Sequence, residues 1–526
     1  MKRRDVLKTA AATAATVGLA RPSLGQGAQV LRFVPQANLS SPDPIWTTAT
    51  VAFIHGYMIW DTLYGLDEKL MPQPQMAAGH EESADGLTFT ITLRDGLKFT
   101  DGAPVLATDC VQSIIRWSKR NPMGGTLMAR CNELVALDDK RLQFRMKKRF
   151  PITAYVLGGE GCFIMPERIA KTDAFTMVTE YIGSGPYSFL RDEWVSGASA
   201  AYARNASYIP RQEPPSMWSG GKIAHFDRVE WKIMPDAATA SAALQRGEVD
   251  WWENPLPDLV PQLRKAPGIK TEVLDPLGAL GVVRFNHLHP PFDNPKLRRA
   301  LIPGIDQNEC ILANYGDLAG ELGRTGAGFF TAGSPYANSA GMEALTGKRD
   351  MALVRKLVAE SGYKGEEVLL MSPTDQAGLQ ATCQVVADYF KKVGLNVAYT
   401  SMDWGTLVAR RAKKEPPAQG GWNIFCTTWS GLAVANPGSS NILRGNGTDG
   451  WFGWATMPKM EALRDAWFDA PDIAAQQKIA RDMQLLAFEE VPVIPSGMYF
   501  TPTAYRSNLT GVLKSGTALM YGVRRV

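Results

Sequence analysis

The segment "LQATCQVVADYFKKVGLNVAYT" constrains the fold strongly, because it joins a helix to a strand through a single glycine. Its first part has the apolar spacing of an amphipathic helix. Gly394 is placed to end that helix, since glycine readily adopts the left-handed conformation that follows a last helical turn. The strand "LNVAYT" comes at once. A helix that leads directly into a strand is part of a β–α–β unit, so the chain is predicted to be an α/β protein.

Two further patterns support mixed α and β structure. "LTFTITL" alternates apolar residues with threonines, which predicts a strand with one buried face. "DIAAQQKIARDMQLLAFEEV" predicts a long helix that stops before Pro492. At 526 residues the chain is too long for one simple core, so two or three domains are expected.

The charge distribution argues against a nucleic-acid partner. The formal net charge is +4, and the first 26 residues account for it with five basic side chains and one acid. The rest of the chain is therefore close to neutral. Nucleic-acid binding depends on a basic surface that makes many phosphate contacts, so that class of function is not expected.

The N-terminus has the layout of an export signal. A charged start is followed by a modest apolar run from Ala10 to Ala20 and then by small residues, which predicts a signal peptide over residues 1–27. Arg3 and Arg4, followed by "DVLK", resemble the twin-arginine signal; an ordinary secretory signal is the alternative. No cysteine stands at the expected cleavage point, and no later stretch has about 18 uninterrupted apolar residues. A periplasmic protein without a lipid anchor or membrane span is expected.

The six cysteines do not form a recognisable metal or redox motif. No C-x-x-C pair occurs, so neither a zinc ribbon nor a redox dithiol is predicted. In an oxidising compartment one or two disulfides are possible, and buried free thiols are the equal alternative. The cysteines are Cys110, Cys131, Cys162, Cys310, Cys383 and Cys426.

Catalytic motifs are absent from the sequence. It contains neither H-E-x-x-H nor G-x-S-x-G, and "GMEALTGKRD" has the wrong glycine spacing for a phosphate loop, with Arg349 where a hydroxyl is needed. We therefore predict no enzyme activity and no cofactor; an exported hydrolase is the weak alternative.

Several strings in a fixed order resemble family 5 of the bacterial extracytoplasmic solute-binding proteins, the dipeptide, oligopeptide and nickel-binding group of ABC importers. "GLTFTITLRDGLKFTDGAPVLATDC" resembles the segment of that family with the pattern Leu-Arg-(Asp)-Gly-x-x-Phe-x-(Asp)-Gly-x-Pro-x-x-Ala-x-Asp. "IGSGPYSF", "ALQRGEVDWWE" and "ESGY" match further family segments. The resemblance covers nearly all of the chain after its signal.

The segment "RFNHLHPPFDNPKLRRAL" contains two histidines beside three basic residues and could suggest a metal site. It also fits a family segment in which His287 and His289 occupy variable loop positions. Asn294 is a good helix cap, and Pro295 suits the first helical position, so a strand, a crossover and a helix start are predicted. Two histidines alone leave a zinc or nickel shell unfilled, so no metal site is predicted. A nickel or nickel-chelate binder would need His225, His287 or His289 at the ligand.

The resemblance implies a two-lobed α/β protein that closes on its ligand like a hinged trap, without making or breaking a bond. A membrane-embedded ABC permease would receive the ligand, and the protein is expected to be a monomer. The implied division places the first lobe at residues 28–50, 180–275 and 495–526, an insertion subdomain on it at 51–179, and the second lobe at 276–494.

The resemblance also implies residues for the ligand site. In "MDWGTLVARR" Trp404 and Arg411 match positions that face the ligand in peptide binders. Arg410 takes the place of Arg411 if the register slips by one residue. The alternative without a ligand role is that Arg411 lies on a solvated helix face. In "CTTWSG" Trp429 matches a pocket tryptophan, and in "VPVIPSGMYF" Tyr499 matches a late aromatic residue. Independently of the resemblance, the glycine-rich loop "GWFGW" is unusually aromatic, so Trp451 and Trp454 are candidates for a pocket wall. The alternative is that their rings only fix the loop to the core.

One position departs from the peptide-binding pattern. In peptide binders of this group an Asp shortly after the pocket tryptophan pairs with the α-ammonium of the peptide, whereas here "SGLAVANPG" contains no acid. The equivalent position is Leu432 or Ala433. The expected ligand is therefore a small organic or peptide-like solute that carries a carboxylate or is neutral. Three acids are candidates for a replacement: Asp43, Asp403 and Asp449.

Overall fold

The computed structural model describes residues 29–47 and 49–526. The predicted signal peptide, residues 1–27, lies outside the described residues. Within the part of the chain that is described, no helix combines the length and the apolar character needed to cross a bilayer.

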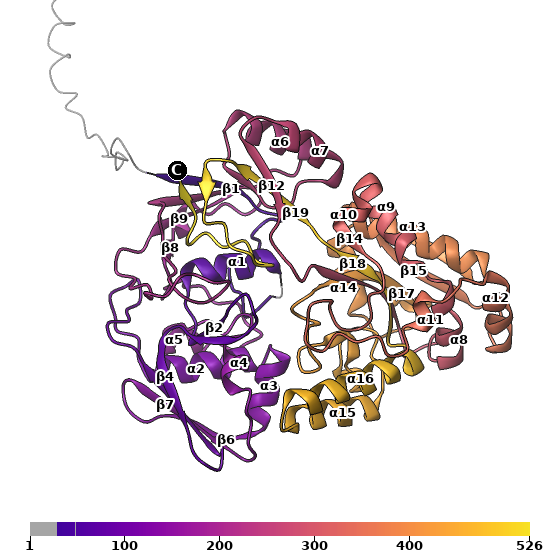
Figure 1. Ribbon diagram of the computed structural model, residues 1–526, viewed down its shortest axis with the longest axis horizontal. Coiled ribbons are helices and arrows are strands. Elements are labelled where there is room, and N and C mark those ends of the chain that lie inside the picture. Colours follow the sequence, from indigo (N-terminus) through magenta and orange to yellow (C-terminus); the bar gives the residue numbers. More distant parts are fainter. Residues whose placement is uncertain (1–28, 48) are drawn as a thin grey trace, which may run out of the picture.

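A seven-stranded sheet organises the first lobe, in the order β12-β19-β11-β1-β10-β9-β8. The central strand β1 (Val30–Val34) runs parallel to β10 (Arg228–Lys232) and to β11 (Trp251–Trp252). The outer strands β8 (Tyr187–Phe189), β9 (Ser199–Arg204), β12 (Ile269–Val273) and β19 (Pro502–Arg506) pair in the antiparallel sense. The N-terminal, middle and C-terminal parts of the chain therefore share one sheet (Figure 1).

A second, four-stranded antiparallel sheet lies within residues 51–179, in the order β4-β5-β7-β6. Its strands are β4 (Ala77–Glu82), β5 (Thr88–Leu93), β6 (Cys131–Ala136) and β7 (Arg141–Met146). In β5 the side chains of Phe89, Ile91 and Leu93 are buried and the threonines are half-buried, which confirms the predicted one-sided strand.

The second lobe is built on a six-stranded sheet in the order β14-β18-β13-β17-β15-β16. Strand β15 (Glu367–Pro373), helix α13 (Ala377–Lys392) and strand β16 (Asn396–Met402) form a parallel β–α–β unit. Gly394 has a φ of 95° after the helix, as predicted. The other strands are β13 (Ala279–Phe285), β14 (Gly323–Arg324), β17 (Ile424–Ser430) and β18 (Val493–Tyr499).

Helices cover both sheets (Figure 1). The first lobe carries α1 (Thr50–Ile59), α2 (Ala107–Ser118), α3 (Pro122–Ala129), α4 (Thr153–Leu157), α5 (Glu167–Ala170), α6 (Ala237–Arg246) and α7 (Val260–Lys265). The second carries α8 (Pro295–Ala300), α9 (Gln307–Tyr315), α10 (Ala319–Leu322), α11 (Glu343–Thr346), α12 (Met351–Glu360), α14 (Trp404–Arg411), α15 (Pro458–Asp469) and α16 (Ile473–Glu490). Two short ribbons complete the fold: β2 (Tyr64–Leu66) with β3 (Pro72–Pro74), and β20 (Leu509–Thr510) with β21 (Arg524–Arg525).

Two chain segments connect the lobes. β12 and β19 are antiparallel neighbours in the first sheet, and their continuations β13 and β18 are antiparallel neighbours in the second. The chain therefore passes between sheets at residues 274–278 and again at 500–501. The second passage is later than the predicted boundary at 494/495, because β18 keeps pairing with β13 and β14 through Tyr499.

The segment 284–301 has the predicted local structure. Strand β13 ends at Phe285, and helix α8 begins at Pro295. The side chain of Asn294 accepts a hydrogen bond from the backbone N–H of Lys296 at 2.9 Å, so it caps the helix as expected.

All six cysteines are buried free thiols, which settles the alternative that the sequence left open.

Candidate ligand-binding site

Helix α14 holds two of the predicted ligand residues, one in its first turn and one in its last. Asp403 caps the helix by accepting the backbone N–H of Thr406 at 2.9 Å. Asp375 accepts the N–H of Trp404 at 2.7 Å, which fixes the start of the helix against the end of β15. Arg411 follows two turns later, so Trp404 and Arg411 project from the same side of a short, anchored helix.

The guanidinium of Arg411 lies among aromatic rings. Its central carbon is 4.9 Å from the ring centre of Phe452, 5.6 Å from that of Trp404 and 5.9 Å from that of Phe425. Nε has no hydrogen-bond acceptor, and burial lowers the pKa of Arg411 to about 10. Among the described residues no carboxylate pairs with it. An unpaired cation held against ring faces is suited to accept a planar anion such as a carboxylate.

Arg410, the alternative position, is oriented differently. Its Nε donates to the backbone carbonyl of Gly421 at 3.0 Å, so this side chain supports the loop that follows α14.

Trp429 and Trp451 continue from the rings around Arg411, and we call Trp404, Phe425, Trp429, Trp451 and Phe452 the aromatic group. Their ring centres are 5.0 Å apart with an interplanar angle of 74°, and Trp451 lies 5.7 Å from Phe425. Phe425 and Trp429 are four residues apart on β17, so both project from the same face of the sheet. Trp429 is half-buried, and its Nε1 has no acceptor. Together these rings form a wall beside the free guanidinium. Their contact with a ligand stays a prediction.

Arg284 fixes this wall, and the sequence analysis missed it. It is fully buried in β13, and its Nε donates to the carbonyl of Phe452 at 2.6 Å while its Nη1 donates to that of Pro492 at 3.0 Å. Its guanidinium carbon lies 4.8 Å from the Trp451 ring. A Cβ on Gly453 would be 2.4 Å from the carbonyl of Phe285, so only glycine fits beside this arginine. An arginine inside the apolar string "ALGVVRF" was the available signal.

The other two predicted site residues are buried. Trp454 belongs to the same hydrophobic cluster as Trp404, Phe425, Trp451 and Phe452, but it is only 3% exposed. Its ring centre lies 5.9 Å from that of Trp422 and 6.4 Å from that of Phe452, so it fixes the loop to the core. Tyr499 is paired with Ala279, whereas Trp429 is paired with the next residue, Leu280, so the two rings project from opposite faces of the sheet. The Tyr499 hydroxyl donates to the carbonyl of Ser496 at 3.0 Å, and its ring packs 6.0 Å from Tyr315 of α9. The structure does not bring Tyr499 to the aromatic group.

The three acids considered as counter-charges for a ligand ammonium differ in whether they are free to contact a ligand. Asp43 is fully buried and accepts two hydrogen bonds from Arg116, at 3.2 and 2.7 Å, so it already has a counter-charge. Asp403 is the cap of α14. Asp449 is exposed at the end of a short 3₁₀ turn. In the run after Trp429, Leu432 packs against the hydrophobic cluster that fills the first lobe and also includes Trp467 and Phe468 of α15.

Glu160, in the loop after α4, is an unpaired acid that the sequence analysis did not single out. Its backbone carbonyl accepts Trp117 Nε1 at 3.1 Å, which holds the loop, but its half-buried carboxylate has no hydrogen-bond donor among the described residues. Burial raises the pKa of Glu160 to about 7.

This shift predicts a stability effect that depends on pH. The folded-state pKa lies above the ordinary value of 4.5, so the folded protein binds the proton more tightly, and stability is lost as the pH rises from about 4.5 to 7. Glu160→Gln should match the wild type in melting temperature at pH 5 and exceed it at pH 8. The gain should be about 1–2 kcal/mol after allowance for partial exposure. The exposed Glu81→Gln serves as control; a Glu160→Gln variant that behaves like it at both pH values contradicts the prediction.

His225, His287 and His289 are the histidines that a nickel binder would need at its ligand. His289 Nε2 lies 2.7 Å from the carbonyl of Lys414, and burial lowers the pKa of His287 well below its ordinary value. The pKa of His225 is lowered by burial and by the positive charges of Arg524 and Arg204. Over residues 29–47 and 49–526, no three His, Cys, Asp or Glu side chains lie close enough together to hold a metal ion.

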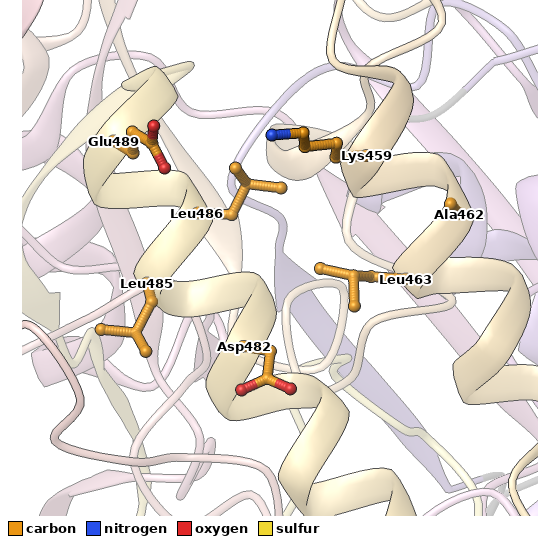
Figure 2. Close-up of a pocket in the computed structure, with 7 residues that line it drawn as sticks. All are labelled: Lys459, Ala462, Leu463, Asp482, Leu485, Leu486 and Glu489. Carbon is orange, nitrogen blue, oxygen red and sulfur yellow. The ribbon is translucent and has the colours of Figure 1, made fainter.

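A separate groove of about 580 Å³ lies between α15 and α16 (Figure 2). Figure 2 shows leucines on both helices beside the gap, with charged residues around them. The lining residues are Lys459, Ala462, Leu463, Asp482, Leu485, Leu486 and Glu489. None of them belongs to the aromatic group around Arg411.

The fold defines a class of protein: two α/β lobes joined by two antiparallel connections, with a discontinuous first lobe and an aromatic group around Arg411 on the second. The profile of the bacterial extracellular solute-binding proteins, family 5 Middle, matches residues 71–451. The chain belongs to this family, whose members are solute-binding components of transporters rather than enzymes.

Known relatives extend the match over the whole chain. The probable peptide ABC transporter periplasmic-binding protein y4tO of Sinorhizobium fredii is 35% identical over 536 residues, covering 100% of this chain and 99% of that protein. The structure of AgaA from A. tumefaciens R10 in complex with agropinic acid has a TM-score of 0.79 at 20% identity, over 94% of this chain and 99% of that one. DppA from Helicobacter pylori, in complex with peptide STSA, has a TM-score of 0.78 at 18% identity, over 95% and 99%.

Proposed function

We propose that this chain is the periplasmic substrate-binding component of an ABC importer and captures an organic solute that carries a carboxylate. The observation that carries the proposal is the guanidinium of Arg411, which belongs to a half-buried side chain, has no protein counter-charge among the described residues and lies among aromatic rings. A buried unpaired cation is costly, and a bound anion offsets that cost.

Each group in the site has a physical role in this proposal. Arg411 offers a planar fork that can bind both oxygens of one carboxylate. Trp429 and Trp451 offer rigid apolar surface for the rest of the solute. Rotation about the connections at 274–278 and 500–501 brings the first lobe over the solute and excludes water. No bond is made or broken, and the closed monomer would be recognised by a membrane-embedded permease.

The solute should not require a free amino group, because no acid follows Trp429 and Asp43 is already paired with Arg116. The related structures hold an opine acid in one case and a peptide in the other, so both ligand classes fit this fold. We expect simple organic acids and N-acetylated peptides to bind at least as well as free di- and tripeptides.

Calorimetry with these three ligand classes tests the proposal. At a ligand concentration 100 times the dissociation constant, a true ligand should stabilise the protein by about 2.7 kcal/mol without turnover. Micromolar binding of free peptides that disappears on N-acetylation would contradict the expected ligand class.

Export is part of the same proposal. Residues 1–27 would serve as a twin-arginine signal, which delivers the folded chain to the periplasm before the signal is removed.

A further inference from the structure

A cluster of charged and aromatic side chains joins the two lobes far from the strands that connect them. Arg130, Lys148 and Phe150 belong to the first lobe, around the four-stranded sheet, and Phe468 and Asp469 end helix α15 of the second. In Figure 1 α15 lies beside α3 and β6 at the bottom of the view, whereas β12 and β19 lie in its upper part. We call these five residues the clasp.

Asp469 is the centre of the clasp. Its Oδ1 lies 2.5 Å from Nη1 of Arg130, and its Oδ2 lies 2.5 Å from Nζ of Lys148. Burial alone would raise the pKa of the Asp469 carboxyl, but the hydrogen bonds and positive charges of Lys148 and Arg130 outweigh it, and the pKa falls below its ordinary value. One carboxylate of the second lobe is thus held by two cations of the first.

Aromatic rings pack against Arg130 of this ion triad. The guanidinium carbon of Arg130 lies 5.5 Å from the ring centre of Phe150 and 5.2 Å from that of Phe468, and the two rings are 5.5 Å apart. Phe150 is 4% exposed and Phe468 2% exposed. Separating the lobes would expose both rings to water and remove the cation–π contact that crosses the gap.

Further contacts join the two lobes in the region between the clasp and the aromatic group. Nδ2 of Asn436 donates to the hydroxyl of Tyr155 at 3.1 Å, and Leu432 packs against the hydrophobic cluster that fills the first lobe and includes Trp467 and Phe468 of α15. Both residues belong to the loop that follows Trp429. The contacts that join the lobes therefore extend from this loop to Asp469.

We propose that the clasp holds the lobes closed by protein–protein contacts alone, even when no solute is bound. The Asp469 ion triad and the Phe150–Phe468 contact each join residues of different lobes. Opening the lobes would break them, so they shift the equilibrium toward the closed arrangement. Because no clasp residue belongs to the aromatic group around Arg411, the shift is the same for every solute and changes all affinities by one common factor.

Small-angle X-ray scattering of the full, ligand-free protein tests the clasp. Asp469→Lys places a third cation beside Arg130 and Lys148, so we expect the ratio of closed to open molecules to fall at least tenfold and the radius of gyration to rise. Lys148→Glu, which makes a matching change on the other lobe, should have the same effect. In wild type, 1 M salt should act in the same direction, because screening weakens the ion triad.

Asp482→Lys is the matched control. Asp482 is on the same helical hairpin but pairs with Lys478 of its own helix at 3.2 Å, so its reversal should leave the scattering curve unchanged. Circular dichroism confirms that each variant is folded. If both Asp469→Lys and Lys148→Glu scatter like the wild type and the control, the clasp does not hold the lobes closed. The test needs no solute, so its outcome is independent of whether the chain binds carboxylates.

Discussion

Replacing Arg411 by methionine is expected to weaken the binding of carboxylate-bearing solutes about 100-fold or more and, at the same time, to raise the melting temperature of the ligand-free protein. The loss follows because a charged hydrogen-bonded partner of a buried anion typically contributes about 2–5 kcal/mol. The gain follows because methionine removes an unpaired cation that burial disfavours and keeps most of its apolar contacts with Phe452 and Trp404.

The control is Arg410→Met. That arginine bonds the carbonyl of Gly421, so its loss should lower stability slightly and leave anion affinity unchanged. Calorimetry and thermal melting measure both quantities. A variant of Arg411 that binds organic acids as tightly as the wild type would exclude this residue from the site.

Trp429→Ala is expected to weaken binding by about 1.5–3 kcal/mol, whatever the charge of the solute, because it removes apolar surface that the solute would cover. The fold should persist, since Trp429 is half-buried and its main ring contact is Trp451. Trp454→Ala should do the opposite, with a clear loss of melting temperature and a small change in affinity, because that ring is buried in the core. A large loss of stability in Trp429→Ala with unchanged affinity would instead place Trp429 in the core.

The sequence predicted those parts of the fold that depend on neighbouring residues. Gly394 ends a helix because its own backbone permits a φ of 95°, and Asn294 caps one because its side chain reaches the next backbone N–H groups. Trp404, Arg411 and Trp429 came from the resemblance to a family, and Trp451 came from the aromatic loop "GWFGW". In the structure the Trp404 ring lies beside the Arg411 guanidinium, and Trp429 and Trp451 contact each other.

Features that depend on residues far apart in the sequence were not predicted. Whether Tyr499 shares a face with Trp429 is decided by one residue of register on β13, and a sequence does not fix that register. Arg284 acts through carbonyls that lie more than 150 residues away in sequence, and Arg130 meets Asp469 at a separation of 339 residues. The second passage between the lobes was placed too early for the same reason, because the end of β18 is set by its partners.

The six buried thiols have a consequence for how the chain reaches its compartment. Three lie in the first lobe and three in the second, and no two of them are joined. An unfolded chain in an oxidising environment would present six reactive sulfurs with 15 ways to pair them completely, every one foreign to the folded protein. Thiols enclosed in a finished core are instead protected from oxidants by lack of access. Folding before the chain meets an oxidant would therefore be a kinetic safeguard against incorrect pairing, which is consistent with the proposed export of an already folded chain.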